Sequence, residues 1–295
     1  MQPLTPVVHT LQGMPAHPFR IVNVFTHKRG ALTGNPLCVF ENASEFSAEV
    51  MQALARQFNL SETTFILPSS RADAGVRIFT PSYEMPFAGH PTLGTAHVCR
   101  ALGLGGESLR LEMPAGLIAV RAQGDRWTLT APTPTWREVD EPRSILARSL
   151  GLEERDIGER PLWIKAGREQ LVVPLATVEA VRRVSPQPEA LRKIASEDGM
   201  SMAYVFAMSG ARTVLARFFF PQGAAILEDP ATGSATANFG GWCLAMQLQL
   251  PVELEISQGE FVGRPSSLYL KVDADRSICV GGDVIELGKG TVTID

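Results

Sequence analysis

The sequence PTLGTA at Pro91–Ala96 has a counterpart in PATGSA at Pro230–Ala235, 139 residues further along the chain. Both segments fit the pattern Pro-x-x-Gly-[Thr/Ser]-Ala, and each follows a strand-like run and a proline-containing loop, which predicts a helix start. A self-similarity at nearly half the chain length predicts two similar domains. Because a helix start leaves backbone N–H groups unpaired and carries a partial positive charge, two facing helix starts predict a site for a small anion.

A titratable residue lies beside each of these two segments. In the register of the repeat, His90 falls on Asp229, and both side-chain types can act as a general acid or base. Two ordinary helix starts can share common residues, and a lone His beside a helix start is more often a structural hydrogen-bonding partner. The paired placement favours a functional site, so we expect a small carboxylate-bearing molecule to bind between the domains.

The composition is typical of a globular protein and excludes several classes. Of the 295 residues, 45% are hydrophobic and 20% charged, and domains of about 150 residues predict two of them. The formal net charge of −4 argues against a nucleic-acid partner. The sequence has neither a secretory signature nor an apolar stretch of about 18 residues, so we expect a cytoplasmic protein without membrane contact.

Metal and cofactor motifs are absent from the sequence. Cys38, Cys99, Cys243 and Cys279 are too far apart for a zinc site and are expected to be reduced and mostly buried. No P-loop, Gly-x-Gly-x-x-Gly or His-Glu-x-x-His motif occurs. We therefore expect no metal and no cofactor.

Strand-like patterns outnumber helical ones by about two to one and do not alternate regularly with them, which predicts an α+β fold with mostly antiparallel sheets. The expected helices are Ser47–Phe58, Pro91–Ala101, Pro142–Leu150, Thr177–Val184, Pro188–Ala195 and Thr232–Leu248. The expected strands are Arg20–Phe25, Leu37–Phe40, Thr63–Leu67, Val76–Phe79, Trp127–Ala131, Leu171–Pro174, Ala203–Met208, Thr213–Phe220, Val252–Ile256, Leu268–Val272, Ser277–Val280 and Thr291–Ile294. Four prolines before Phe19 predict a flexible lead-in over residues 1–18.

Several blocks, in a fixed order, carry a resemblance to a known family. They are Gly34–Pro36, Ser61–Phe65, Phe79–Pro81 running into Phe87–Gly94, Glu228–Ala235, and Gln258–Gly259 with Gly263–Ser266. Together they cover the chain from about residue 19 to its end, and they resemble the signature blocks of the PhzF family of phenazine-biosynthesis-like isomerases.

The resemblance implies a diaminopimelate-epimerase-like fold. In that fold two pseudo-symmetric α+β domains each wrap a mostly antiparallel sheet around a central helix, and the active site lies in the cleft between them. The last strand typically returns to the first domain. We therefore expect a first domain of residues 19–133 with 283–295, and a second of residues 134–282.

The resemblance also implies roles for individual residues. Glu62 matches the catalytic carboxylate, which removes a proton from a C–H bond and delivers it elsewhere on the same molecule. His90 and Asp229 match residues that hold and polarise the substrate and assist protonation. The residues that match substrate-binding positions are Gly89, Gly233 and Ser234, with Asn35 as a further cleft residue.

Two acids in the same blocks, Glu84 and Glu228, compete with Glu62 for the catalytic role. We expect both to act as hydrogen-bonding supports.

Cysteine placement separates two reaction types. Related racemases and epimerases of this fold use two thiols, one in each helix-start motif, whereas neither Ala88–His90 nor Asp229–Ala231 contains Cys. This favours a cofactor-independent isomerase. The alternatives are a racemase or epimerase of an amino or hydroxy acid, and a binding or scaffold protein without turnover, since a fold does not fix a function. A homodimer is expected because it is the common oligomer of soluble proteins.

Overall fold

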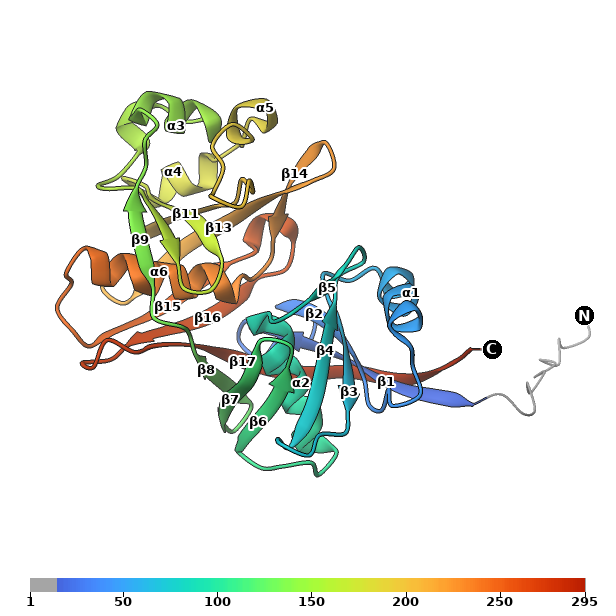
Figure 1. The fold of residues 1–295 in the computed structure, drawn as a ribbon. Helices are drawn as coiled ribbons and strands as arrows, with labels where there is room; N and C mark the ends of the chain where they lie inside the picture. Colours follow the sequence, from blue (N-terminus) through green and yellow to red (C-terminus); the bar gives the residue numbers. More distant parts are fainter. Residues whose placement is uncertain (1–14, 295) are drawn as a thin grey trace, which may run out of the picture.

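The computed structural model describes residues 15–294 and consists of a mixed β-sheet structure with few helices. Its longest strand, β17 (Ile278–Thr293), runs through both halves of the molecule (Figure 1). The first part of β17 pairs with strands of both halves, and residues 284–293 pair with the first strand of the chain. This strand therefore connects the two halves through main-chain hydrogen bonds.

In the first half, strands surround helix α2 (Gly89–Ala101). They pair in a ring that β17 closes, in the order β1 (Ala16–Val24), β2 (Asn35–Phe40), β3 (Thr63–Leu67), β4 (Ala74–Phe79), β6 (Ser108–Met113), β7 (Gly116–Gln123) and β8 (Arg126–Thr130). A short strand, β5 (Glu84–Met85), pairs with β4 just before α2. Most of α2 is buried, as expected for a helix with small and apolar residues on every face.

The second half repeats this arrangement around helix α6 (Gly233–Ala245). Its strands are β9 (Thr135–Glu138), β10 (Leu162–Lys165), β11 (Glu169–Pro174), β12 (Ala203–Met208), β13 (Thr213–Gln222), β15 (Val252–Gln258) and β16 (Ser266–Val272). From β10 to β17 the pairings are antiparallel, parallel, antiparallel, parallel, antiparallel and antiparallel. From β1 to β8, antiparallel and parallel pairings follow one another in the same sequence. Strand β14 (Ala225–Asp229) pairs with β13 as β5 pairs with β4.

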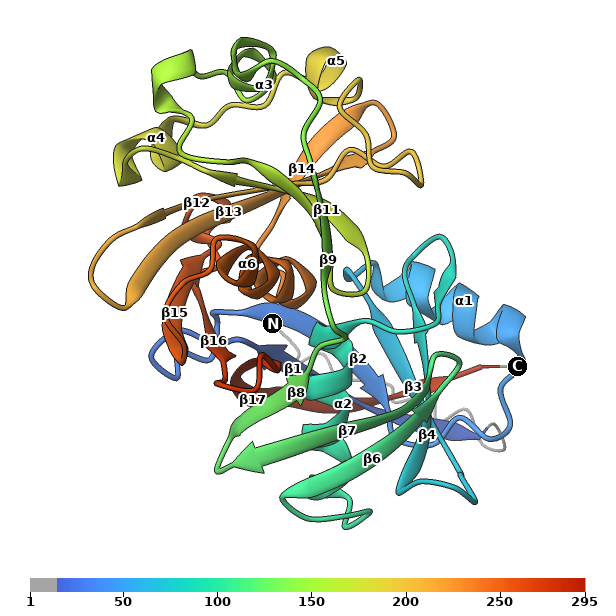
Figure 2. The ribbon, with the colours of Figure 1, turned by 60° about the vertical axis from the view of Figure 1, so that its left-hand side comes forward.

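Short helices cover the outer faces of both halves (Figures 1 and 2). Helix α1 (Ala48–Phe58) packs over an aromatic cluster on β2, β3 and β4. On the other half, α3 (Arg143–Ser149), α4 (Val178–Arg183) and α5 (Pro188–Leu191) pack against β10 to β13. A separate inner core, centred on α2 and α6, runs through both halves. The single-turn helices η1 (Glu154–Asp156) and η2 (Glu260–Val262) complete the elements.

The sequence predicted helix α1 closely. Ser47 is its N-cap and accepts a hydrogen bond from the N–H of Val50, and Asn59 ends it in the left-handed conformation. The expected helix Pro188–Ala195 is shorter, because α5 ends at Leu191. The expected helix Thr232–Leu248 ends at Ala245, since Gln247 has a φ of 56°.

The lead-in was predicted to reach residue 18, but β1 begins at Ala16. Pro18 fits into this strand because β1 has a partner on one side only at that point: β17 pairs with residues 16–24, and β2 pairs only from Phe19 onward. The remainder of the predicted lead-in, residues 1–14, lies outside the described residues.

The predicted register of the repeat is wrong by five residues. Helices α2 and α6 each have 13 residues and begin at Gly89 and Gly233, so Gly94 lies inside α2 and is not the equivalent of Gly233. Consequently His90 corresponds to Ser234, the second residue of the other helix, and does not correspond to Asp229. A six-residue pattern with two wildcards matched a segment in the body of α2 because small residues occur throughout this buried helix.

Candidate active site

Glu62 and His90 form a hydrogen-bonded pair in the first half. Glu62 directly precedes β3, His90 is the second residue of α2, and the distance from His90 Nδ1 to Glu62 Oε2 is 3.0 Å. The side chain of His90 is 7% exposed and that of Glu62 18%. An ionised carboxylate only accepts hydrogen bonds, so this contact places a proton on His90 Nδ1. His90 Nε2 is buried and has no hydrogen-bonding partner among residues 15–294.

Asp229, the last residue of β14, accepts a hydrogen bond at each carboxylate oxygen. Asn35 Nδ2 donates to Oδ1 over 3.1 Å, and Thr232 Oγ1 donates to Oδ2 over 2.5 Å. Burial raises the pKa of Asp229 to about 7; the charge of Glu62 acts in the same direction, and the hydrogen bond from Thr232 opposes it. Asp229 therefore changes protonation state near neutral pH, as a general acid or base requires.

The orientation of the Thr232 hydroxyl follows from Gln258. Gln258 Nε2 donates to the carbonyl oxygen of Asp229 over 2.8 Å, and its Oε1 accepts from the N–H of Thr232 over 3.3 Å. These backbone partners fix the amide orientation, so Nε2 must also be the donor in its 3.0 Å contact with Thr232 Oγ1. The hydroxyl of Thr232 therefore donates its hydrogen to the carboxylate of Asp229.

Asn35, the first residue of β2, bridges the two halves. Its Nδ2 contacts both Asp229 Oδ1 and the carbonyl oxygen of Ala231, each over 3.1 Å. Asn35 is 2% exposed, and its Oδ1 has no partner within the described part of the chain. Of the residues predicted for the cleft, Asn35 thus contacts the predicted acid–base group directly.

The starts of α2 and α6 lie next to each other. A Cβ atom built on Gly233 would lie 3.9 Å from the backbone nitrogen of His90 and 3.2 Å from Phe25 Cζ. The N-cap residues Ala88 and Thr232 make no side-chain capping bond, and neither first turn holds an acidic residue. Both ends thus offer backbone N–H groups to an anion.

A hydrogen-bonded chain of side chains leads to Ser234, the second residue of α6. Gln170 Nε2 donates to Ser234 Oγ over 3.0 Å, and Asn238 Nδ2 donates to Gln170 Oε1 over 2.7 Å. Gln170 is 2% exposed and Asn238 is fully buried. The sequence reasoning missed Gln170, Asn238 and the role of Gln258; only Gln258 lay in a block that had been singled out.

Glu84 and Glu228 are hydrogen-bonding supports, as expected. Arg77 on β4 binds both carboxylate oxygens of Glu84, at 2.7 and 2.6 Å, and Arg217 on β13 does the same to Glu228, at 3.1 and 2.7 Å. These equivalent pairs fix β5 and β14, the strands that lead into the two helix starts.

The cysteines lie away from the helix starts, toward the other ends of α2 and α6. Cys99 and Cys243 are buried, and burial raises the pKa of each thiol to about 12. Cys38 is buried as well, and Cys279 is partly buried. The prediction of mostly buried free thiols is confirmed.

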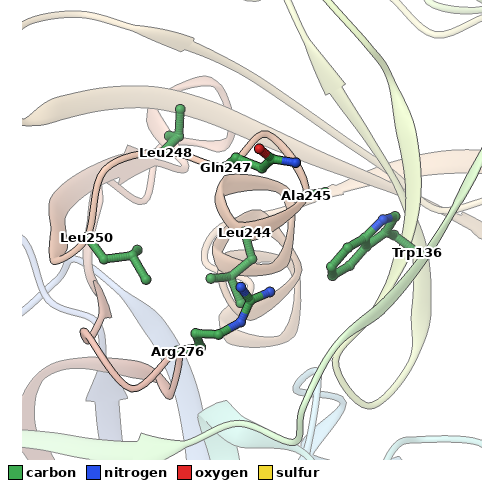
Figure 3. Close-up of a pocket in the computed structure, with 7 residues that line it drawn as sticks. All are labelled: Trp136, Leu244, Ala245, Gln247, Leu248, Leu250 and Arg276. Atoms are coloured by element: carbon green, nitrogen blue, oxygen red, sulfur yellow. The ribbon is translucent and has the colours of Figure 1, made fainter.

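Other features of the structure lie apart from this arrangement. A hollow of about 410 Å³ is found at the opposite end of α6, and Figure 3 shows the residues around it: Trp136, Leu244, Ala245, Gln247, Leu248, Leu250 and Arg276. None of the predicted site residues lines it. In residues 15–294, no cluster of three or more His, Cys, Asp or Glu side chains is arranged to hold a metal ion. No helix of that part is long and apolar enough to cross a membrane.

Comparison with known proteins places the chain among proteins of similar length. A relative from Pasteurella multocida, an uncharacterized isomerase, is 36% identical over 94% of both chains. The trans-2,3-dihydro-3-hydroxyanthranilate isomerase of Pseudomonas chlororaphis is 35% identical over 94% of this chain and 100% of its own. The crystal structure of a PhzF-family phenazine biosynthesis protein from Bacillus anthracis has the same fold, with a TM-score of 0.83 and 24% identity over 95% of this chain and 100% of its own.

The family model described as phenazine biosynthesis-like protein, PhzC-PhzF, matches residues 22–289. This match spans nearly all of the described strands and both central helices, and it confirms the family resemblance of the sequence blocks. The chain belongs to the PhzC-PhzF family of phenazine biosynthesis-like proteins, and it is an isomerase of that family.

Proposed function

We propose that this isomerase moves a proton within a small carboxylate-bearing molecule held between the starts of α2 and α6. Glu62 removes a proton from one carbon atom and delivers a proton to another carbon of the same molecule, with exchange against solvent protons while the carboxyl group holds it, so that substrate and product have the same composition. The pairing of Glu62 with His90, beside a second acid that titrates near pH 7, is the observation that carries this proposal.

Each neighbour of Glu62 has a distinct task in this scheme. His90 holds the carboxylate of Glu62 through Nδ1 and has Nε2 available for a polar group of the substrate. Asp229, with its pKa of about 7, donates or accepts a proton at a substrate heteroatom as charge develops there. The backbone N–H groups at Gly89 and Gly233 and the hydroxyl of Ser234 bind the carboxylate, while Asn35 holds Asp229 in place.

The architecture proposed for this reaction is that of two pseudo-symmetric, diaminopimelate-epimerase-like domains. The repeated order of strand pairings supports it, as do the switch of pairing partners between β8 and β9 and the passage of β17 from one half to the other. The proposed boundaries stay at residues 19–133 with 283–295 for the first domain and 134–282 for the second. A cytoplasmic homodimer without nucleic-acid or membrane partners also stays a prediction.

A ring carboxylate is the substrate class we test first. The relative from Pseudomonas chlororaphis is named for trans-2,3-dihydro-3-hydroxyanthranilate, which has a carboxylate, an amino group and a hydroxyl group on a partly saturated ring. Anion-binding helix starts and an acid–base pair suit such a molecule. A thiol-based racemase is less well supported, since Cys99 and Cys243 are buried away from the helix starts.

Isotope exchange tests the proposal directly. The enzyme is incubated with trans-2,3-dihydro-3-hydroxyanthranilate in heavy water, and deuterium in substrate and product is followed by mass spectrometry. We expect Glu62→Gln to lower the exchange rate by about 10²–10⁴-fold, the usual contribution of a general acid or base. Glu154→Gln, an exposed acid on η1, is the matched control and should behave as wild type. Equal exchange in wild type and Glu62→Gln would refute the role of Glu62.

A further inference from the structure

The side chains behind Ser234 form a relay that starts at the backbone. Asn238 Oδ1 accepts a hydrogen bond from the N–H of Ala166 over 2.7 Å, and Asn238 Nδ2 donates to the carbonyl oxygen of Arg168 over 3.0 Å. A backbone N–H can only donate and a carbonyl oxygen can only accept. The orientation of the Asn238 amide is therefore fixed.

The fixed amide of Asn238 determines the orientation of the Gln170 amide, and the Gln170 amide in turn determines how the Ser234 hydroxyl is used. Because Asn238 Nδ2 donates to Gln170 Oε1, the amide nitrogen of Gln170 faces Ser234 and donates to its Oγ. The Ser234 hydroxyl accepts a hydrogen bond from Gln170, so it must donate its own hydrogen to a different acceptor. Ser234 is partly exposed, and no acceptor for that hydrogen is found among residues 15–294.

Thr232, two residues earlier, differs from Ser234 in how its hydroxyl hydrogen is used. Its hydroxyl accepts from Gln258 and donates to Asp229, so its hydrogen is used within the protein. Gly233, the residue before Ser234, lies next to the backbone of His90 on the adjoining helix start, since a Cβ atom built on it would be 3.9 Å from the backbone nitrogen of His90. The hydroxyl of Ser234 and the free N–H groups of the first turn of α6 thus form a group of donors without a built-in acceptor.

We propose that Gln170 and Asn238 determine specificity by keeping Ser234 a hydrogen-bond donor, so that this end of the cleft selects an ionised carboxylate over a neutral carboxamide. A carboxylate accepts at both oxygens, whereas a carboxamide presents an NH₂ donor that faces other donors. Gln170 and Asn238 are positioning residues that act through Ser234. The inference rests on the proposed function in one respect, namely that a carboxylate-bearing ligand lies against α6.

The test is equilibrium binding of a matched pair of probes, anthranilate and anthranilamide, measured by titration calorimetry on the full-length protein. We expect wild type to prefer anthranilate. Ser234→Ala and Gln170→Leu should each reduce the preference for anthranilate by about tenfold, the usual value of a hydrogen bond to a charged group. The ratio of the two affinities is the readout, since a general loss of structure would weaken both probes together.

A double-variant cycle separates the relay from a packing effect. If Gln170 acts through Ser234, adding Gln170→Leu to Ser234→Ala should change the ratio no further. A further change in the double variant, or an unchanged ratio in Ser234→Ala, would overturn the inference, and so would a wild type that binds neither probe. Where Gln170→Leu fails to fold, Gln170→Met, which has a similar length and no donor, takes its place; it should reduce the ratio in the same way, and an unchanged ratio would overturn the inference. The deuterium experiment decides the proposed function separately, because binding of these probes requires no turnover.

Discussion

The two helix starts occupy equivalent places in the two halves and differ in the side chains that they present. At the start of α2, the second residue is His90, which pairs with the ionisable Glu62. At the start of α6, the equivalent residue is Ser234, which is held by the neutral amides of Gln170 and Asn238. The first turn of α2 thus presents a histidine paired with a carboxylate, and the first turn of α6 presents an uncharged hydroxyl. In the proposed scheme, Glu62 of the first half acts on the C–H bond, and the second half supplies Asp229 and the donor group at Ser234.

The supporting ion pairs of the two halves differ in burial, which gives the largest expected effect. Arg217 and Glu228 are each 9% exposed, and Arg217 also donates to the carbonyl oxygens of Val181 and Val184. Arg77 and Glu84 are 28% and 31% exposed. Arg217→Met should lower the free energy of unfolding by about 3–5 kcal/mol, the cost of leaving a buried charge without its partner. Arg77→Met should cost about 1 kcal/mol or less.

Urea denaturation of both variants measures this difference. Glu228→Gln and Glu84→Gln serve as the matched pair on the acidic side and should rank in the same order. Equal losses for Arg217→Met and Arg77→Met would contradict the view that the second half depends on a buried ion pair to fix the strand that ends in Asp229.

The raised pKa of Asp229 should give a smaller, pH-dependent effect on the free energy of unfolding, and this effect arises in the second half. Its folded-state pKa, about 7, lies above the ordinary value of 3.8, so the folded state binds the proton more tightly than the unfolded state. The contribution of Asp229 to stability is therefore greatest at low pH and declines as the pH rises through about 7. Asp229→Asn, which stays neutral, should gain stability relative to wild type between pH 5 and pH 8.

Thr232→Val tests how the hydrogen bond from Thr232 affects the pKa of the Asp229 carboxylate. The hydrogen bond from Thr232 lowers the pKa of Asp229, so its loss should raise that pKa and move the corresponding limb of the pH–rate profile to higher pH. Thr236→Val, a change one turn further along α6 at a hydroxyl that donates to the carbonyl oxygen of Thr232 and makes no bond to Asp229 among residues 15–294, is the control. An unmoved limb would show that Asp229 does not titrate in the rate-determining step.

The sequence predicted five of the eight strands in each half, β1 to β4 and β8 in the first and β11 to β13, β15 and β16 in the second, and it missed β5 to β7, β9, β10 and β14. The elements with local signals were predicted best. Helix α1 has a serine cap, an asparagine terminator and a regular apolar stripe, and all three are local. Strand β17 was expected as two short strands, since Gly281, Gly282, Gly288 and Gly290 interrupt its apolar pattern. Three of these glycines have a tertiary cause. A Cβ on Gly281 would lie 2.6 Å from the carbonyl oxygen of Trp127, one on Gly282 would lie 2.3 Å from Phe25 Cδ1, and one on Gly290 would lie 2.9 Å from Phe19 Cζ.

The site shows the same limit. Glu62 was found through a family block and His90 first through the internal repeat, whereas their contact links positions 28 residues apart. Gln170 and Asn238 were missed because an amide in a strand and an amide in a buried helix have no local signature. Their role exists only where β11 and α6 meet. The predicted pairing of His90 with Asp229 failed for a related reason, since composition alone cannot fix where a uniformly buried helix begins.

The thiols give the smallest expected effect on activity and the sharpest contrast with a two-thiol enzyme. Cys99 and Cys243 occupy equivalent places in α2 and α6, since each is the eleventh residue of its helix. Both thiols are fully buried, and the raised pKa keeps them protonated at neutral pH. Cys99→Ala and Cys243→Ala should keep deuterium exchange close to the wild-type rate and lower the free energy of unfolding by about 1 kcal/mol. If either change abolished exchange while Glu62→Gln retained it, the carboxylate mechanism would be wrong and a thiol would be the base.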